Sequence, residues 1–350
     1  MKIFVTGGAG FIGSNFIRHV LGLGNNHAVV NYDKLTYAGN LANLESVEQN
    51  HNYWFVKGDI CDASAVQAAM TGCDAIVHFA AESHVDRSIY EPAPVIETNV
   101  TGTFILLQIA RTVGIKKFVH VSTDEVYGDF PPGEFADENS QLQPSSPYSA
   151  SKAGSDLLVR SYVRTYGFPA VITRASNNYG QFQFPEKFLP LMITNALDDK
   201  PLPIYGDGKQ ERDWLHVEDH CAGILAVLER GRIGEVYNIG GLDIEENLTM
   251  ARRILRLMGK PETLLTYVKD RPGHDRRYAL NCRKIERELG WKPRILLEDG
   301  LRETIDWYRR NGEWLAGVRG GQYLSYYEKY YVNRDSSLQA LSPAAARTSH

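Results

Sequence analysis

The stretch "VTGGAGFIGSNF", residues 5–16, places a cluster of glycines between an apolar β-strand pattern and a helical pattern. It contains Gly8-x-Gly10-x-x-Gly13 and the overlapping Gly7-x-x-Gly10-x-x-Gly13. Such glycines permit a tight turn and a close approach of the backbone to a pyrophosphate at the positive end of the helix. The glycine pattern alone is weak, but the strand before it and the helix after it are both in place. The stretch therefore predicts a dinucleotide-binding loop.

Apolar strand patterns alternate with helical patterns through residues 1–175. This alternation predicts an α/β fold, a Rossmann-type doubly wound parallel sheet with helices on both faces. After about residue 176, prolines interrupt the pattern, and we expect a smaller, mixed α/β substrate lobe over residues 176–330. A helix and a strand at about 212–242 are predicted to rejoin the first lobe. Residues 333–350 have few large apolar side chains and are predicted to form a disordered tail.

The composition is that of a globular protein, with 43% hydrophobic and 23% charged residues. A formal net charge of −4 argues against nucleic acid as a partner. The chain has no apolar run long enough to span a bilayer, no signal-peptide pattern, and four widely spaced cysteines without a C-x-x-C pair. We therefore expect a cytoplasmic protein without a membrane partner.

Two acidic residues follow the next strands. Asp33, in "NYDKL", stands twenty residues after Gly13. An acid there accepts hydrogen bonds from both hydroxyls of the adenosine ribose and repels the 2′-phosphate of NADP, so we predict NAD. Asp59, in "GDI", could contact the adenine edge. A plain turn residue after a strand is the alternative for both acids, and it is stronger for Asp59.

Tyr148 and Lys152, in "YSASK", are four residues apart, which places them on one face of a helix. Pro147 suits the first position of that helix. A tyrosine with a pKa near 10 is a poor base, and we expect the lysine ammonium to lower that pKa. An ordinary amphipathic helix is the alternative. Because the pair follows a glycine loop in the chain, we favour the interpretation that Tyr148 and Lys152 are catalytic.

The stretch "HVSTDEVYG", residues 120–128, places Asp124 and Glu125 side by side after a strand. Consecutive residues in a continuing strand face opposite sides, so both acids reach one substrate only if the strand ends near Ser122 or Thr123. Adjacent acids in a partly desolvated site do not ionise independently, and one tends to keep a proton. The pair thus suits a division into acid and base, although the sequence does not show which acid is protonated. A polar strand end without function is the alternative.

Together, the glycine loop, Asp33, "HVST" and "YSASK" resemble the extended short-chain dehydrogenase/reductase superfamily over about residues 1–330. Further stretches narrow the resemblance to its dTDP-glucose 4,6-dehydratase family: "YDKLTYAGNLANL", "HFAAESHVDRSI", "STDEVYG", "RASNNYGQFQFPEKFLPLMI", "GDGKQERDWLHVEDHC" and "DRPGHDRRYALN". The resemblance implies oxidation at carbon 4 of the sugar, loss of water across carbons 5 and 6, and return of the hydride to carbon 6, with NAD regenerated in each cycle. Epimerases of the superfamily mostly carry other residues at positions 124 and 125.

The resemblance also implies residue roles. Asp124 would be the acid, Glu125 the base, and Thr123 a hydrogen-bond partner of the carbon-4 oxygen, beside Tyr148 and Lys152. The implied cofactor-binding residues are Gly7, Gly10, Phe11, Ile12, Gly13, Asp33, Lys34, Leu35, Thr36, Asp59, Ile60, Ala80, Ala81, Ser83, Thr98, Tyr148, Lys152 and Asn178. The implied substrate-binding residues are His84, Thr123, Asn177, Lys187, Phe188, Pro203, Ile204, Tyr205, Arg212, Asn247, Arg271 and His274.

Some of these expectations have support in the residues themselves. Arginines such as Arg212 and Arg271 can grip diphosphate oxygens bidentately, although such clusters commonly lie on a solvated surface. His84 has no partner at metal-ligand spacing, so we expect no metal. The apolar helices at "APVIETNVTGTFILLQIARTVG" and "YSASKAGSDLLVRSYVRTYG" correspond to a dimer bundle in the superfamily, which predicts a homodimer. Burial within one chain is the alternative.

Other functions stay open at this point. The chain could be another NAD-dependent nucleotide-sugar dehydratase or epimerase, acting on a UDP- or GDP-sugar. A non-enzymatic NAD-binding protein is disfavoured, because the threonine, both acids, the tyrosine and the lysine are all present. The pathway also stays open, between rhamnose for a surface polysaccharide and a deoxysugar for a secondary metabolite.

Overall fold

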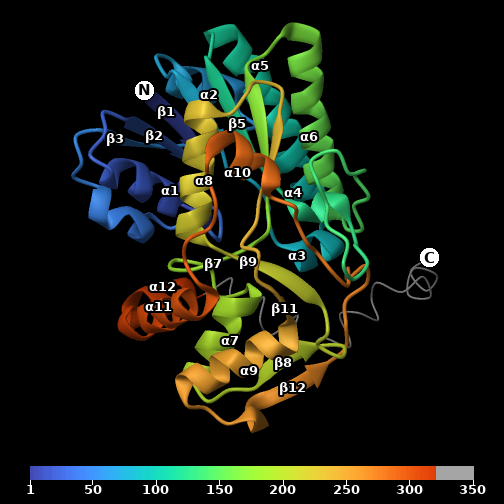
Figure 1. Cartoon of the computed structure of the whole chain (residues 1–350). Helices are drawn as coiled ribbons and strands as arrows, with labels where there is room; N and C mark the ends of the chain where they lie inside the picture. Colours follow the sequence, from blue (N-terminus) through green and yellow to red (C-terminus); the bar gives the residue numbers. More distant parts are fainter. Residues whose placement is uncertain (321–350) are drawn as a thin grey trace, which may run out of the picture.

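Seven parallel strands form the central sheet of the structure, a computed structural model that describes residues 1–320 (Figure 1). The strand order is β10-β6-β5-β4-β1-β2-β3. Their bounds are β1 Lys2–Thr6, β2 Ala28–Asp33, β3 Tyr53–Lys57, β4 Ala75–His78, β5 Lys117–Thr123, β6 Ala170–Ala175 and β10 Val236–Ile239. The order reverses direction at β1, between β2 and β4, which is where doubly wound sheets bind ligands. This topology confirms the predicted fold class. The tail predicted at residues 333–350 lies outside the described residues.

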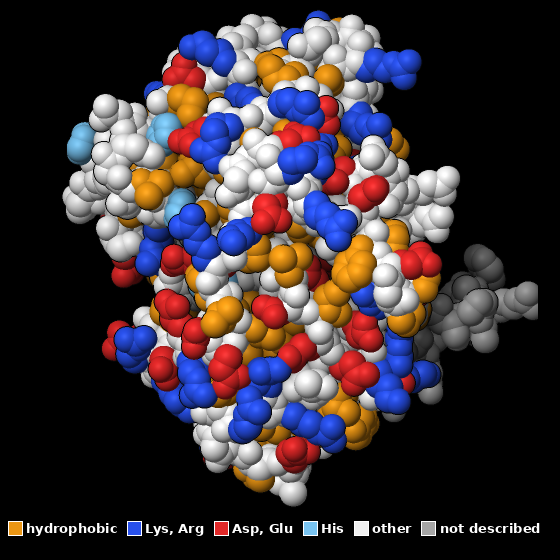
Figure 2. All heavy atoms as spheres, in the orientation of Figure 1, with side chains coloured by type: hydrophobic (Ala, Val, Ile, Leu, Met, Phe, Trp, Pro, Cys, Tyr) orange, Lys and Arg blue, Asp and Glu red, His pale blue; other side chains and the backbone are white. Residues whose placement is uncertain are grey.

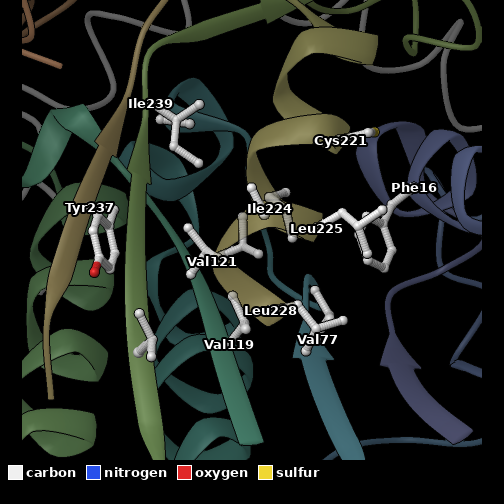
Figure 3. Packing of buried hydrophobic residues seen from close by; sticks show 14 of the residues in the cluster. Phe16, Val77, Val119, Val121, Cys221, Ile224, Leu225, Leu228, Tyr237 and Ile239 are labelled. Atoms are coloured by element: carbon white, nitrogen blue, oxygen red, sulfur yellow. The ribbon is translucent and has the colours of Figure 1, made fainter. Parts of the chain in front are cut away.

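Helices cover both faces of this sheet. One face carries α1 Phe11–Gly22, α8 Val217–Arg230 and α10 Arg283–Leu289, and the other carries α2 Ala63–Met70, α5 Thr103–Val113 and α6 Pro147–Tyr166. Figure 3 shows Val119 and Val121 of β5 packed toward Leu225 and Leu228 of α8, with Phe16 of α1 beside them. A helix from the second half of the chain therefore covers the sheet built by the first half.

The helix expected over residues 93–114 is divided. It consists of α4 Pro92–Ile96, a π-helical turn Glu97–Gly102 and α5, preceded by α3 Val85–Tyr90. Within the π-turn, the Asn99 side chain accepts a hydrogen bond from the Glu82 N–H (2.9 Å) and donates one to the Glu82 carbonyl (3.0 Å). Single π-turns are frequent at functional sites. Here the turn fixes the loop that follows β4.

The smaller lobe has its own hydrophobic core, built around Met192, Ile204, Ile254 and Leu301. Its sheets contain β7 Asn177–Tyr179, β9 Glu211–His216 and β11 Ile244–Glu246, and β8 Leu202–Tyr205 paired with β12 Leu265–Val268. Its helices are α7 Phe188–Leu197, α9 Asn247–Met258, α11 Leu297–Arg310 and α12 Gly312–Val318. In Figure 1 this lobe lies below the carboxyl ends of the main sheet.

The surface shown in Figure 2 carries basic and acidic side chains interspersed with one another. Among residues 1–320, no helix combines the length and the apolar character needed to cross a membrane. Within the same part of the chain, no group of three His, Cys, Asp or Glu side chains is placed to hold a metal ion.

Candidate active site

A cavity of about 310 Å³ opens where the main sheet meets the smaller lobe. It lies at the carboxyl ends of the strands, at the reversal of strand order. Every predicted cofactor-binding residue except Leu35 lines it: Gly7, Gly10, Phe11, Ile12, Gly13, Asp33, Lys34, Thr36, Asp59, Ile60, Ala80, Ala81, Ser83, Thr98, Tyr148, Lys152 and Asn178. The structure thus gathers at one place residues that are spread over about half of the chain.

The glycine loop forms a cradle in this cavity. Gly7 has a φ of +71°, and a Cβ there would lie 2.6 Å from the backbone nitrogen of Ala80. A Cβ on Gly13 would lie 2.3 Å from the Gly7 carbonyl oxygen, so strand and helix can pack closely only with glycine. Gly10 is the N-cap of α1 and has no side chain to cap the helix. The amide groups of the first turn are therefore left for a ligand, and the cradle fits a pyrophosphate.

Asp33 ends β2 and is held in place by two backbone amides. Its carboxylate accepts hydrogen bonds from the N–H groups of Ala9 (2.9 Å) and Leu35 (2.8 Å), and burial raises its pKa. A carboxylate has about four acceptor sites, so two remain for ribose hydroxyls. Leu35 was predicted to contact the cofactor, but it does not line the cavity, and its N–H donates to Asp33. Lys34 pairs with Asp59 at 2.6 Å at the rim of the same cavity.

Strand β5 ends at Thr123, and a 3₁₀ turn, Asp124–Tyr127, follows at once. The expected strand end is therefore confirmed, and Thr123, Asp124 and Glu125 all line the cavity. The Thr123 hydroxyl donates to Asp124 Oδ1 at 3.2 Å and accepts from the Glu125 N–H at 3.3 Å. The turn brings both acids to one side, where a continuing strand would have separated them.

The two acids have different electrostatic surroundings. Burial raises the pKa of Asp124 well above its usual value, and the negative charges of Glu125 and Asp213 raise it further. Burial also raises the pKa of Glu125, but the cations Arg271, Lys187 and Arg212 counteract this effect. Asp124 Oδ2 has no hydrogen-bond partner among the described residues. These surroundings favour the protonated form of Asp124, whereas the cations near Glu125 favour its ionised form.

The tyrosine–lysine pair lies in the first turns of α6. Pro147 occupies the first helical turn, as expected, and Ser146 and Ser149 form a capping box. Lys152 Nζ donates to the Val121 carbonyl at 2.9 Å, and burial lowers the pKa of this ammonium to about 8. The helix start therefore fixes both side chains of the pair beside the end of β5.

The expectation that Lys152 lowers the pKa of Tyr148 is wrong for this structure. Burial raises the pKa of Tyr148, and the negative charges of Glu125 and Asp124 raise it further. Thr123 lowers this pKa by a smaller amount, and the Lys152 ammonium is directed at a strand carbonyl and not at the phenol. Without ligands, the surroundings of Tyr148 therefore favour the protonated phenol.

A second cavity of about 150 Å³ adjoins the first, because Glu125, Asn177, Glu186 and Lys187 line both. The predicted substrate residues His84, Asn177, Lys187, Phe188, Pro203, Tyr205, Arg212, Asn247, Arg271 and His274 line it. The buried atoms Asn177 Oδ1, Asn247 Oδ1 and Arg271 Nε have no hydrogen-bond partner within residues 1–320. Unpaired buried polar atoms are costly, so this cavity is suited to a polar ligand. Its cations favour an anionic one.

Ile204 was predicted to bind the substrate, but it does not line the second cavity. It lies in β8 between Pro203 and Tyr205, which both line the second cavity. Side chains alternate along a strand, so Ile204 points the opposite way and is fully buried in the core of the smaller lobe.

Several residues of the site have no signal in the sequence pattern. Asn99 positions the loop after β4, as described above. Glu186 pairs with Arg87, whose guanidinium lies 3.9 Å from the centre of the Tyr37 ring, so that three separate segments are joined at the cavity wall. Tyr278 lies under the guanidinium of Arg212 at 4.3 Å. These contacts join distant segments, and no spacing along the chain indicates them.

A doubly wound sheet with a glycine cradle at its strand-order reversal, a tyrosine–lysine pair and a second, cationic cavity defines a nicotinamide-dependent enzyme of the extended short-chain dehydrogenase/reductase class. Within that class the chain belongs to the family described as GDP-mannose 4,6 dehydratase, whose model matches residues 4–304.

Curated relatives and solved structures agree with this assignment. The dTDP-glucose 4,6-dehydratase of Shigella flexneri is 50% identical, covering 95% of this chain and 100% of that protein. The dTDP-glucose 4,6-dehydratase of Streptomyces niveus is 50% identical, covering 90% of this chain and 94% of that protein. The crystal structure of DesIV, a dTDP-glucose 4,6-dehydratase from Streptomyces venezuelae with NAD and TYD bound, is 51% identical and has a TM-score of 0.89, covering 91% of this chain and 100% of that one. A UDP-glucose 4-epimerase from Thermotoga maritima has a TM-score of 0.83 at 30% identity, covering 89% of this chain and 99% of that one.

Proposed function

We propose that this chain is a dTDP-glucose 4,6-dehydratase (EC 4.2.1.46), which converts dTDP-glucose to dTDP-4-keto-6-deoxyglucose and water. The observation that carries this proposal is the 3₁₀ turn after β5, which presents Asp124 and Glu125 to the cavity that holds Tyr148. Plain oxidation or epimerisation at carbon 4 needs no such acid pair, whereas elimination needs an acid and a base at adjacent carbons. Relatives of about 50% identity with this activity support the proposal.

The first cavity would hold NAD through the cradle at Gly10, the carboxylate of Asp33 and the Lys152 ammonium. When bound, NAD accepts a hydride from carbon 4 and gives it back to carbon 6 in the same turnover. Tyr148 would take the proton of the carbon-4 hydroxyl as a phenolate, which must form against its raised pKa, and Thr123 would hydrogen-bond the carbon-4 oxygen. The resulting ketone acidifies the proton on carbon 5.

The elimination is assigned to the acid pair. Glu125, held toward its ionised form by Arg271 and Lys187, removes the proton from carbon 5. Asp124, whose pKa is raised by burial and by neighbouring negative charge, protonates the departing carbon-6 hydroxyl. These roles follow from the surroundings of each side chain, because the two residues are adjacent in sequence but differ in their charged neighbours.

The second cavity would hold the nucleotide diphosphate. Its phosphate oxygens would be bound by Arg212 and Arg271, with Asn247 and His274 nearby. Arg271 is already fixed by Asp86 through a 2.7 Å ion pair, so its guanidinium is ordered before a ligand binds. Because its Nε has no partner among the described residues, that donor is available to a phosphate oxygen.

A homodimer completes the proposal. Apolar side chains on α4, α5 and α6 remain exposed in the single chain: Ile96 at 47%, Phe104 at 40%, Leu157 at 55% and Tyr166 at 53%. Contiguous exposed apolar surface is typical of an interface. Light scattering should show a dimer that Leu157→Glu separates, while Tyr267→Glu, at a similarly exposed position on β12 of the smaller lobe, leaves it intact. A cytoplasmic setting is consistent with four cysteines that form no disulfide in the structure.

The decisive experiment is one incubation with dTDP-glucose in deuterated water without added NAD. We expect a product that has lost one water, with deuterium at carbon 5 and none at carbon 6. An epimerase would give a product of unchanged mass. Solvent deuterium at carbon 6 would contradict the internal return of the hydride. Parallel incubations with UDP-glucose and GDP-mannose test the choice of nucleotide.

A further inference from the structure

Arg174 of β6 is a buried arginine that takes no part in the proposed dehydration, and the following inference rests on that proposed function. Its side chain is 1% exposed. Nε donates to Asp156 Oδ2 at 2.8 Å, and Nη1 donates to the Tyr127 hydroxyl at 2.9 Å. Nη2 has no hydrogen-bond partner among residues 1–320. A buried charge is costly unless it is paired and hydrogen-bonded, so Asp156 and Tyr127 together hold this guanidinium in place.

Tyr127 is the last residue of the 3₁₀ turn Asp124–Tyr127, which presents the two acids to the cavity. The tyrosine is 2% exposed. Its hydroxyl accepts from Arg174 and donates to Asn238 Oδ1 of β10 at 2.7 Å. The far end of the turn is therefore fixed by side chains of two neighbouring strands of the main sheet.

Asp156 belongs to α6, the helix that carries Tyr148 and Lys152. It follows Lys152 by about one helical turn and Tyr148 by about two. Burial lowers the pKa of the Lys152 ammonium, and the negative charge of Asp156 counteracts this effect. The carboxylate that pairs with Arg174 is thus part of the helix that performs the oxidation at carbon 4.

The position of Asp124 depends on the turn, because its carboxylate has few contacts of its own. Oδ1 accepts from the Thr123 hydroxyl at 3.2 Å, and Oδ2 has no hydrogen-bond partner in the described part of the chain. The turn starts where β5 ends, at Thr123, and finishes at Tyr127. Loss of the contacts at Tyr127 would leave the turn fixed at its first end alone.

The oxidising pair, Tyr148 and Lys152, has separate supports. The Tyr148 N–H donates to Ser88 Oγ at 3.2 Å, and Lys152 Nζ donates to the Val121 carbonyl at 2.9 Å. Neither contact involves Tyr127. A change at Tyr127 should therefore displace the acids and leave the oxidising pair in place.

We propose that Tyr127 and Arg174 are positioning residues, which hold the two acids at a fixed place relative to the oxidising pair. The connection runs from the acid turn through Tyr127 and Arg174 to Asp156 on α6. None of these three side chains lines either of the two cavities, so they act through the elements that they join. Elimination needs an acid and a base aligned with carbons 5 and 6 while carbon 4 stays beside Tyr148.

Tyr127→Phe, which keeps the ring and removes the hydroxyl, tests this inference in the NAD-loaded protein. Product mass from dTDP-glucose measures dehydration. Reduced-nicotinamide absorbance with dTDP-xylose measures oxidation alone, because that sugar lacks carbon 6 and its hydroxyl. We expect dehydration to fall by about 10- to 100-fold, the scale of a small misplacement of a catalytic group, while oxidation stays within about 2-fold of wild type.

The matched control is Tyr237→Phe. Tyr237 is also fully buried, and its hydroxyl accepts from the Arg232 N–H at 3.2 Å and donates to Glu288 Oε2 at 3.0 Å. It lies in β10 beside Asn238 but lines neither cavity. This variant loses a buried hydroxyl of the same kind and should change neither rate.

Equal losses of oxidation and dehydration in Tyr127→Phe would overturn the inference, because the hydroxyl would then support the fold in general. Unchanged dehydration, or the same selective loss in Tyr237→Phe, would overturn it as well. Should Tyr127→Phe fail to fold, Asn238→Ala, which removes the acceptor of the same hydroxyl, is measured and judged in the same way. The proposed function fails separately, if wild-type protein releases no dehydrated product from dTDP-glucose.

Discussion

Replacing Glu186 with glutamine should measure how strongly a buried ion pair holds the wall shared by the two cavities. The Glu186 side chain is 1% exposed, and its Oε2 accepts from Arg87 Nε at 3.1 Å and Nη2 at 2.9 Å. Hydrogen bonds to charged groups contribute about 1.5–3 kcal/mol and neutral ones about 1 kcal/mol. Removing the charge from this two-bond contact should therefore lower the free energy of unfolding by about 2 kcal/mol.

The control is Glu262→Gln, which alters an exposed pair joined by one hydrogen bond of similar length. Arg252 Nε lies 3.0 Å from Glu262 Oε2, but the two side chains are 50% and 62% exposed. Exposed pairs are worth at most about 1 kcal/mol and often nothing measurable, so this variant should stay within about 0.5 kcal/mol of wild type. Urea unfolding of the NAD-loaded proteins gives both values. Equal losses in the two variants would refute the reasoning, since burial would then not determine the strength of the pair.

Three further predictions concern the chemistry and the cofactor. Glu125→Gln should still oxidise carbon 4, seen as reduced-nicotinamide absorbance, while water loss measured by product mass falls by about 10³-fold; dehydration at the normal rate would contradict its role as base. Asp213→Asn removes a negative charge that raises the pKa of Asp124, so the loss of kcat with rising pH should begin at a lower pH than in wild type; an unmoved alkaline limb would contradict this. Gly13→Ala places a Cβ 2.3 Å from a backbone carbonyl oxygen and should release NAD during gel filtration, whereas Gly22→Ala, in open space on the same helix, should retain it.

The parts of the site that the sequence predicts are those set by local structure. A glycine loop between a strand and a helix has few possible conformations, so the cradle at Gly10 could be inferred from residues 5–16 alone. The end of β5 at Thr123 follows from the same kind of reasoning, because two adjacent acids can share a substrate only beyond a strand end. The strand and helix alternation likewise fixes where the carboxyl ends of parallel strands gather.

What the sequence does not show depends on neighbours distant along the chain. The pKa of Tyr148 is raised because the fold buries the phenol and aims the Lys152 ammonium elsewhere, which an i, i+4 spacing does not reveal. The difference between the two acids arises from Arg271 on one side and Asp213 on the other. Ile204 was misplaced because a resemblance over a strand does not state which face each residue occupies.

The cations that bind the diphosphate also set the basicity of Glu125, and this coupling has a consequence for pH dependence. Arg271, Lys187 and Arg212 counteract the effect of burial on its pKa in the free protein. A bound diphosphate brings negative charge to the same cations, so the pKa of Glu125 should rise when the substrate binds. The base must be ionised, and activity is therefore lost as the pH falls through that pKa.

This reasoning predicts different acidic limbs for two kinetic constants. The pH profile of kcat/KM reports the free protein, and that of kcat reports the substrate complex. The acidic limb of kcat should therefore lie at higher pH than that of kcat/KM. An Arg212→Gln variant, which removes one of the shared cations, should move the limb of kcat/KM to higher pH and so reduce the separation. Coincident limbs in the wild-type protein would show that the diphosphate and Glu125 do not share these cations. The same cations would therefore determine both the affinity for the diphosphate and the pKa of Glu125.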